Sequence, residues 1–185
     1  MYIFQLIVYL IQMALKINYL NKLNDKIKGN IVFFLSNNYK FNDLATLPTK
    51  KNVDKIIKNI NPKSFKETSF FSYDLEVGQK IIFVNLANKS TANEYEQLGA
   101  NFFEYIKKNK IYLTNILGNS LKSNAKNLEY FIHGIHLKSY EFNIYKTKKN
   151  EKNFILNVYS KNSSLEIKRK RSQLTSLAKG TFFCR

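Results

Sequence analysis

The chain has 185 residues, a formal net charge of +17, 44% hydrophobic residues and 15% aromatic residues. This length and apolar content are typical of one folded domain with a substantial core, and they exclude an intrinsically disordered chain. Two prolines and six glycines exclude a collagen-like or linker-rich protein. The only cysteine, Cys184, excludes a disulfide within the chain and favours a reducing, cytoplasmic location.

The positive charge has two interpretations. Nearly all basic residues are lysines, and arginine occurs only at positions 169, 171 and 185. Arginine is the usual bidentate partner of phosphate and guanine, whereas Lys, Asn, Ile, Phe and Tyr all have A/T-rich codons. The composition therefore favours coding bias over a dedicated surface for nucleic acid. A basic α/β module that binds nucleic acid or another polyanion remains the alternative function.

The chain begins with the apolar stretch MYIFQLIVYLIQMAL. This stretch is short for a membrane-spanning helix and contains Gln5 and Gln12, and it has neither the basic start nor the cleavage site of a signal peptide. We expect translation to start at Met13, which makes residues 1–12 a doubtful extension and leaves no membrane partner. A membrane anchor or signal, and an ordinary buried element, are the alternatives.

Strands and helices alternate in the first half of the chain. Strands are predicted at 16–20 and 30–36, and the run IVFFL in the second is typical of a strand buried on both faces. Thr49 is expected to cap a short helix that Pro62 closes. Two further strands, 69–73 and 80–86, flank a turn at 76–78 and predict a hairpin.

The second half continues the alternation. A capping box, Thr91 to Glu94, opens a helix, and the acidic residues 94, 96 and 104 are expected to lie on its solvated face. A strand at 111–116, a helix from Ser123 and a strand at 153–160 follow. A second capping box, Ser163 to Glu166, opens the last helix. Apolar stripes are predicted on these helices at Tyr95, Leu98, Phe102 and Ile106, at Leu128, Phe131, Ile132 and Ile135, and at Leu174, Leu177 and Ala178. The pattern predicts an α/β fold, a mixed sheet with helices on both faces.

No catalytic arrangement is visible in the sequence. His133 and His136 are three residues apart and share a helix face, but no Asp or Cys cluster accompanies them, so we interpret them as ordinary polar positions. The scattered glycines provide no phosphate-binding loop. Cys184 is interpreted as a small buried residue. We therefore predict no catalytic, cofactor-binding or metal-binding residue in this chain.

Three segments carry a family resemblance in the same order. The first is KIIFVNLANKSTANEYEQLGANFFEYIKKNKI, the second is GIHLKSYEFNIYKT, which starts at Gly134, and the third is LTSLAKGTFFCR at the end. Together they resemble the N-terminal domain of the cytosol (leucyl) aminopeptidase family, with matching Tyr140, Phe142, Gly180 and Arg185. Asn143 stands where the family often has Asp, and Asn85 and Ala87 replace usual glycines.

The resemblance implies a fold and a function. The fold is similar to macro domains, and it covers residues 13–160, with residues 161–185 as a linker helix toward a catalytic domain outside this chain. The family's catalytic domain holds two divalent metals, zinc or manganese, cleaves N-terminal residues from peptides and assembles as a homo-hexamer. The coding sequence after Arg185 is expected to continue into that domain, whereas a stop codon there would favour the binding module.

Overall fold

The computed structural model describes residues 15–22, 27–35, 68–76, 78–86, 89–121, 125–140, 153–160 and 164–183. The strands are β1 (Leu15–Leu20), β2 (Asn30–Leu35), β3 (Phe70–Glu76), β4 (Gln79–Asn85), β5 (Leu113–Leu117) and β6 (Phe154–Tyr159). The helices are α3 (Ala92–Lys108), α4 (Ala125–Lys138) and α5 (Leu165–Phe183), with a short 3₁₀ helix, η3 (Gly118–Ser120). Every strand predicted from the sequence is confirmed to within two or three residues.

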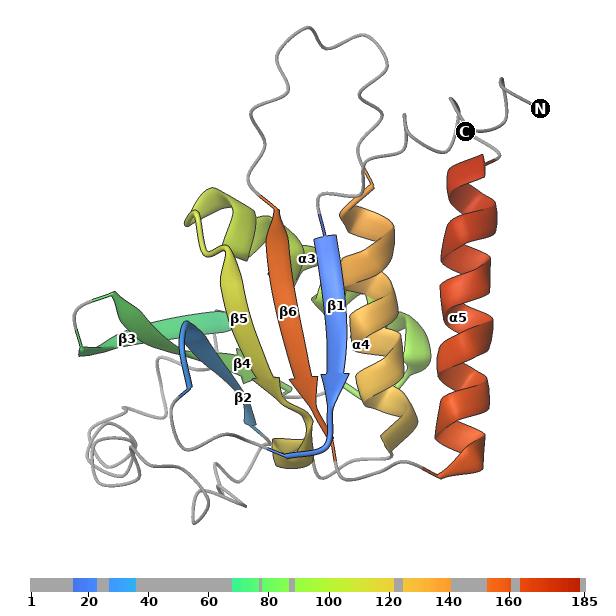
Figure 1. The fold of residues 1–185 in the computed structure, drawn as a ribbon, viewed down its shortest axis with the longest axis horizontal. Helices are drawn as coiled ribbons and strands as arrows, with labels where there is room; N and C mark the ends of the chain where they lie inside the picture. Colours follow the sequence, from blue (N-terminus) through green and yellow to red (C-terminus); the bar gives the residue numbers. More distant parts are fainter. Residues whose placement is uncertain are drawn as a thin grey trace, which may run out of the picture.

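The six strands form one mixed sheet in the order β1-β6-β5-β2-β4-β3 (Figure 1). Neighbouring strands are parallel except β3 and β4, which form the predicted antiparallel hairpin. Gly78 in the hairpin turn has a φ of +81°, a left-handed conformation that glycine adopts without steric cost. The mixed α/β sheet predicted from the alternation is therefore confirmed.

The two central strands are buried on both faces, as the continuous apolar run predicts. Ile31 to Leu35 of β2 and Ile81 to Val84 of β4 are each at most 2% exposed. Alternate residues of these strands enter different clusters, because successive side chains of a strand point to opposite faces. Each of these fully buried side chains contributes about 1.5–3 kcal/mol to folding.

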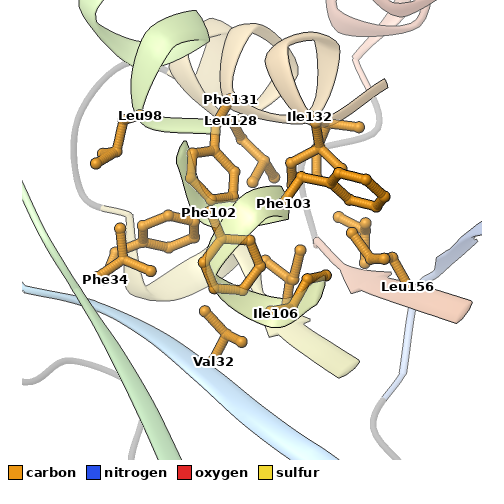
Figure 2. Packing of buried hydrophobic residues seen from close by; sticks show 14 of the residues in the cluster. Val32, Phe34, Leu98, Phe102, Phe103, Ile106, Leu128, Phe131, Ile132 and Leu156 are labelled. Atoms are coloured by element: carbon orange, nitrogen blue, oxygen red, sulfur yellow. The ribbon is translucent and has the colours of Figure 1, made fainter. Parts of the chain in front are cut away.

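Helices α3 and α4 cover one face of the sheet, and aromatic rings fill the space between the layers. Phe131 of α4 packs edge-on against Phe34 of β2, with ring centroids 5.1 Å apart. The same ring lies 5.5 Å from Phe102 of α3. Figure 2 shows these rings surrounded by Val32, Leu98, Phe103, Ile106, Leu128, Ile132 and Leu156. The stripes predicted for these two helices are thus confirmed as core.

The other face of the sheet carries a second apolar cluster, made of Ile31, Phe33, Leu35, Ile81 and Phe83. The helix expected between Thr49 and Pro62 lies outside the described residues, as do residues 1–12, Cys184 and the segment 141–152. Within the described part of the chain, the helices thus lie on one side of the sheet.

The start of α3 has the capping box predicted from its sequence. The Thr91 hydroxyl accepts a hydrogen bond from the Glu94 backbone N–H, and the Glu94 carboxylate accepts one from the Thr91 N–H at 2.8 Å. Backbone N–H groups of Ser90 and Thr91, and the Thr91 hydroxyl, lower the pKa of Glu94 to about 2. The box satisfies N–H groups that the first helical turn leaves without partners.

The predicted capping box of α5 is wrong by one residue. Ser164, not Ser163, provides the side-chain oxygen that accepts from the Ile167 N–H at 3.3 Å. Glu166 instead pairs with Lys126 of α4 at 2.6 Å. The predicted stripe is also wrong at Leu177, which is 61% exposed, because α5 rests on α4 through a narrower line of side chains. Among the described side chains of α5, the buried hydrophobic ones are Ile167, Leu174 and Ala178.

No described helix combines the length and the apolar character that crossing a bilayer requires.

Candidate functional site

Helices α3 and α4 cross at two glycines in backbone contact. A Cβ built on Gly134 would lie 1.8 Å from the Glu96 carbonyl oxygen, and one built on Gly99 would lie 1.9 Å from the Phe131 carbonyl oxygen. Real Cβ atoms essentially never approach so closely, so only glycine allows this crossing. Gly134 opens the segment GIHLKSYEFNIYKT, and the crossing gives this residue a physical reason for being glycine.

Both histidines of α4 are buried, which their interpretation as ordinary polar positions did not include. His133 is 9% exposed, and its Nδ1 lies 3.0 Å from Glu96 Oε1 of α3. His136 is 8% exposed. Glu96 was expected on a solvated face, but its carboxylate is only 29% exposed and faces the interface between the two helices. The spacing of apolar residues along α3 does not predict this contact, because the partner of Glu96 belongs to a different helix.

His136 predicts a pH dependence of stability. Burial, followed by the charges of His133 and Lys179, lowers the pKa of His136 to about 4. In the unfolded chain the same group titrates near 6.5, so between these values the unfolded state binds more protons. The free energy of unfolding should therefore be highest above pH 6.5 and fall by roughly 2–3 kcal/mol as the pH drops to 4. Urea titrations at pH 7.0, 5.5 and 4.5 measure this, and the slope should flatten in His136→Gln.

A buried ion pair joins α5 to α4. Arg171 donates two hydrogen bonds to the Glu129 carboxylate, from Nη2 to Oε1 at 2.8 Å and from Nε to Oε2 at 3.1 Å. The Glu129 side chain is 2% exposed. Its neighbour Tyr19, on β1, places its hydroxyl 3.4 Å from Glu129 Oε2 and its ring centroid 3.5 Å from the Arg171 guanidinium carbon. Burial, and then the Glu129 carboxylate, raise the pKa of Tyr19, so the hydroxyl remains a donor.

A cleft lies beside this ion pair, between β1, α4 and α5. Its volume is about 340 Å³. Apolar side chains line part of it, and the ion pair and the two histidines provide the polar part. The lining residues are Leu15, Lys16, Ile17, Tyr19, Glu129, Ile132, His133, His136, Arg171, Leu174 and Thr175. The sequence did not predict the cleft, because it combines residues more than 150 positions apart.

Three asparagines form a ladder across the sheet face away from the helices. Asn18 of β1 donates to Asn157 of β6 at 3.0 Å, and Asn157 donates to Asn115 of β5, also at 3.0 Å. Asn115 in turn donates to the backbone carbonyl oxygens of Lys28 and Asn30. Since parallel strands place these residues at the same register position, the amides satisfy one another in a row.

Among the described residues, no group of three or more His, Cys, Asp and Glu side chains is arranged to hold a metal ion. The ion pair, the His133–Glu96 contact and the glycine crossing all hold elements together. None places a nucleophile beside a base.

Comparison with known proteins identifies the family. The model of the cytosol aminopeptidase family, N-terminal domain, matches residues 31–149. A probable cytosol aminopeptidase of Wolbachia pipientis wMel is 30% identical over 141 residues, which are 75% of this chain. The chain spans only 27% of the length of that relative.

Solved structures agree on the fold. A tomato leucine aminopeptidase mutant superimposes with a TM-score of 0.62 at 15% identity, over 90% of this chain and 36% of the tomato chain. A weaker similarity, with a TM-score of 0.51 at 8% identity, links 90% of this chain to 24% of an alphavirus P23pro-zbd chain. The alternative of a stand-alone nucleic-acid module has no support among these comparisons. The chain belongs to the cytosol aminopeptidase family, and it corresponds to the N-terminal domain of that family.

Proposed function

We propose that this chain is the non-catalytic domain of a two-metal, leucyl-aminopeptidase-like peptidase that removes N-terminal residues from peptides. The observation that carries the proposal is the family match over residues 31–149, supported by the similarity of the whole sheet to a leucine aminopeptidase. The chain spans 27% of the curated relative and 36% of the tomato chain, and the proposal assigns the chemistry to the remaining part of the protein.

The metals, zinc or manganese, belong to that remaining part in this proposal. The described residues do not fit a two-metal centre, since they bring no three metal-binding side chains together. Two metals would supply an activated water for attack on the peptide carbonyl. Within this chain we assign the residues of the helix crossing and the ion pair to holding α3, α4 and α5 in place. Residues 13–160 would form the domain body, and α5 would lead toward the catalytic domain.

The assembly and location follow from the same proposal. We expect the complete protein to form a homo-hexamer in the cytoplasm, with this domain at its periphery. Light scattering coupled to size-exclusion chromatography of the complete protein measures the assembly. A monomeric but active enzyme would remove the hexamer from the proposal while leaving the aminopeptidase function intact.

An activity assay tests the proposed function. The 185-residue chain should release no p-nitroaniline from leucine p-nitroanilide with Mn²⁺ or Zn²⁺, because the proposal assigns the metal centre to the remaining part of the protein. The product of the full reading frame that encodes it should release p-nitroaniline, and EDTA should abolish the activity. Metal-dependent release by the 185-residue chain alone would overturn the non-catalytic role. A full product without such activity would overturn the aminopeptidase proposal.

A further inference from the structure

Strand β1 lies at an edge of the sheet that the described residues form. It pairs with β6 on one side, and no strand among the described residues pairs with it on the other. The Leu20 carbonyl oxygen accepts from the Ser160 N–H at 3.2 Å, so residue 20 points toward β6. Because the direction alternates along a strand, the N–H and C=O groups of Ile17 and Tyr19 point outward. Such a row is a template for another strand.

The opposite edge of the sheet is protected in a way that β1 is not. The pairing of β3 shifts register between Asp74 and Glu76, and such an irregularity bends an edge away from new partners. Asp74 is also exposed and pairs with Lys80 at 3.0 Å. On β1 the register with β6 is unbroken over six residues, and Lys16 is its only charged residue.

The cleft described above runs along this open edge. Every second residue of β1 lines the cleft with a side chain, because Leu15, Ile17 and Tyr19 point to the face of the sheet that the helices cover. Lys16 also lines the cleft although alternation directs its side chain to the other face, so the β1 backbone itself forms part of the wall. Arg171, Leu174 and Thr175 of α5 form the far wall. In Figure 1, β1 lies at the edge of the sheet beside α4 and α5.

The asparagine ladder ends at this same edge. Each asparagine donates its amide N–H toward the centre of the sheet, from Asn18 to Asn157 and from Asn157 to Asn115. Because these hydrogen bonds all run toward the centre of the sheet, the Asn18 Oδ1 is the acceptor at the β1 end of the ladder. A strand added beside β1 with a donor side chain at this register position would extend the ladder.

We propose that the edge of β1, with the cleft under α5, binds an extended peptide segment as an additional strand. Adding a strand to an exposed sheet edge is an established mode of peptide recognition, in which main-chain hydrogen bonds give affinity and pockets for alternate side chains give specificity. Apolar side chains of the segment enter the cleft against Leu15, Ile17 and Leu174. Polar and acidic side chains face Lys16 and Asn18 on the other side.

The charge beside β1 indicates which kind of peptide segment binds there. The Glu129 carboxylate and the Arg171 guanidinium balance each other's charge, so the exposed Lys16, which also lines the cleft, gives this edge a positive charge. A second copy of the chain would bring another formal charge of +17 to the same edge. A segment with alternating apolar and acidic residues matches the site better than a second copy.

Binding of the acetylated and amidated peptide Val-Glu-Val-Asn-Val tests the proposal. Titrated into the ¹⁵N-labelled 185-residue chain, it should shift the amide resonances of residues 15–20 and saturate at millimolar or lower concentration. The same peptide with Lys in place of Glu should bind at least threefold more weakly, and the difference should shrink in 0.5 M salt. Two N-methylated versions, one modified at the three Val amides and one at Glu and Asn, should behave differently. In an extended peptide the Val N–H groups point to one side and the Glu and Asn N–H groups to the other, so only one of the two sets faces β1. Methylation of the set that faces β1 should weaken binding at least tenfold, and methylation of the other set should leave binding unchanged.

Matched variants of α5 separate the cleft from the outer helix face. Thr175→Trp fills the cleft and should weaken peptide binding at least tenfold, whereas Gln173→Trp on the exposed face should leave it within twofold. Unchanged dispersion of the amide spectrum shows that both variants fold. Absence of β1 shifts, equal binding of the two N-methylated peptides, or full binding by Thr175→Trp would each overturn the proposal. Dimerisation through β1, blocked by Thr175→Trp, would replace the peptide with a second copy.

Discussion

Replacing Gly134 with alanine is expected to lower the free energy of unfolding by about 3 kcal/mol or more. The new Cβ would meet the Glu96 carbonyl oxygen at 1.8 Å, and this atom belongs to helical backbone that cannot rotate away. The two helices must therefore separate, which opens the aromatic core that Phe102 and Phe131 close between them. Urea denaturation followed by circular dichroism measures the loss.

Two further glycines give the matched comparison. Gly99→Ala should have a comparable cost, since its Cβ would lie 1.9 Å from the Phe131 carbonyl oxygen. Gly180 lies in α5 with nothing within 4 Å of the corresponding position. Gly180→Ala should therefore raise stability by about 0.5–1 kcal/mol, because alanine is the better helix former. A Gly134→Ala protein as stable as Gly180→Ala would show that the crossing does not require contact between the backbones.

The sequence predicts well those elements whose signals are local. The capping box at Thr91 and the apolar period after it define α3 without reference to the rest of the chain. The continuous run IVFFL predicts a strand buried on both faces, and β2 is buried in that way. The hairpin follows from two strands separated by a turn at Gly78. Each of these features depends on residues a few positions apart.

Features that depend on distant residues were missed or assigned wrongly. Strand order places β1 beside β6, and no local pattern encodes a pairing of residues 15–20 with 154–159. Glu96 has the spacing of a solvated helix position, but it faces His133 of another helix. Ser163 and Glu166 have the spacing of a capping box, yet Glu166 finds Lys126 and the helix begins one residue later. In each case a tertiary partner decided between local alternatives.

That this chain contributes no catalytic residue remains a prediction. The family match is compatible with it, because the matching model is that of a family's N-terminal domain. The match ends at residue 149, and the chain spans only a part of its relatives. The segment beginning at Gly134 indicated the family through its sequence similarity. The structure adds that its first residue sits at the closest approach of two helices, so this part of the motif is architectural.

Removing the Glu129 carboxylate is the second change with a large expected effect. In Glu129→Gln the Arg171 guanidinium keeps its charge at a half-buried position and loses its bidentate partner, which should cost about 3 kcal/mol or more. Tyr19→Phe is the matched control, because it keeps the ring under the guanidinium and removes only a 3.4 Å hydrogen bond. It should cost about 1 kcal/mol or less.

The part of the protein that loses stability in Glu129→Gln distinguishes this prediction from a general destabilisation of the fold. Among the α5 side chains that the structure describes, the buried hydrophobic ones are Ile167, Leu174 and Ala178, so we expect the ion pair to carry a large share of the helix's attachment. Hydrogen exchange in Glu129→Gln should therefore accelerate first in α5, while α3 and the central strands β2 and β4 keep their protection. Uniform loss of protection in all elements would contradict a local role for the pair.

A double replacement separates the worth of the pair from the cost of leaving one charge behind. In Glu129→Leu combined with Arg171→Met, no buried charge remains, and the apolar side chains adjoin Ile132 and Leu174 at the cleft. Replacing a buried pair by packed apolar residues is often neutral or stabilising, so the double variant should lie within about 1 kcal/mol of the natural chain. Each single replacement should be worse than the double one. If the double variant instead lost as much as the two single variants summed, the pair itself would be the stabilising element, and α5 would depend on its geometry rather than on charge balance.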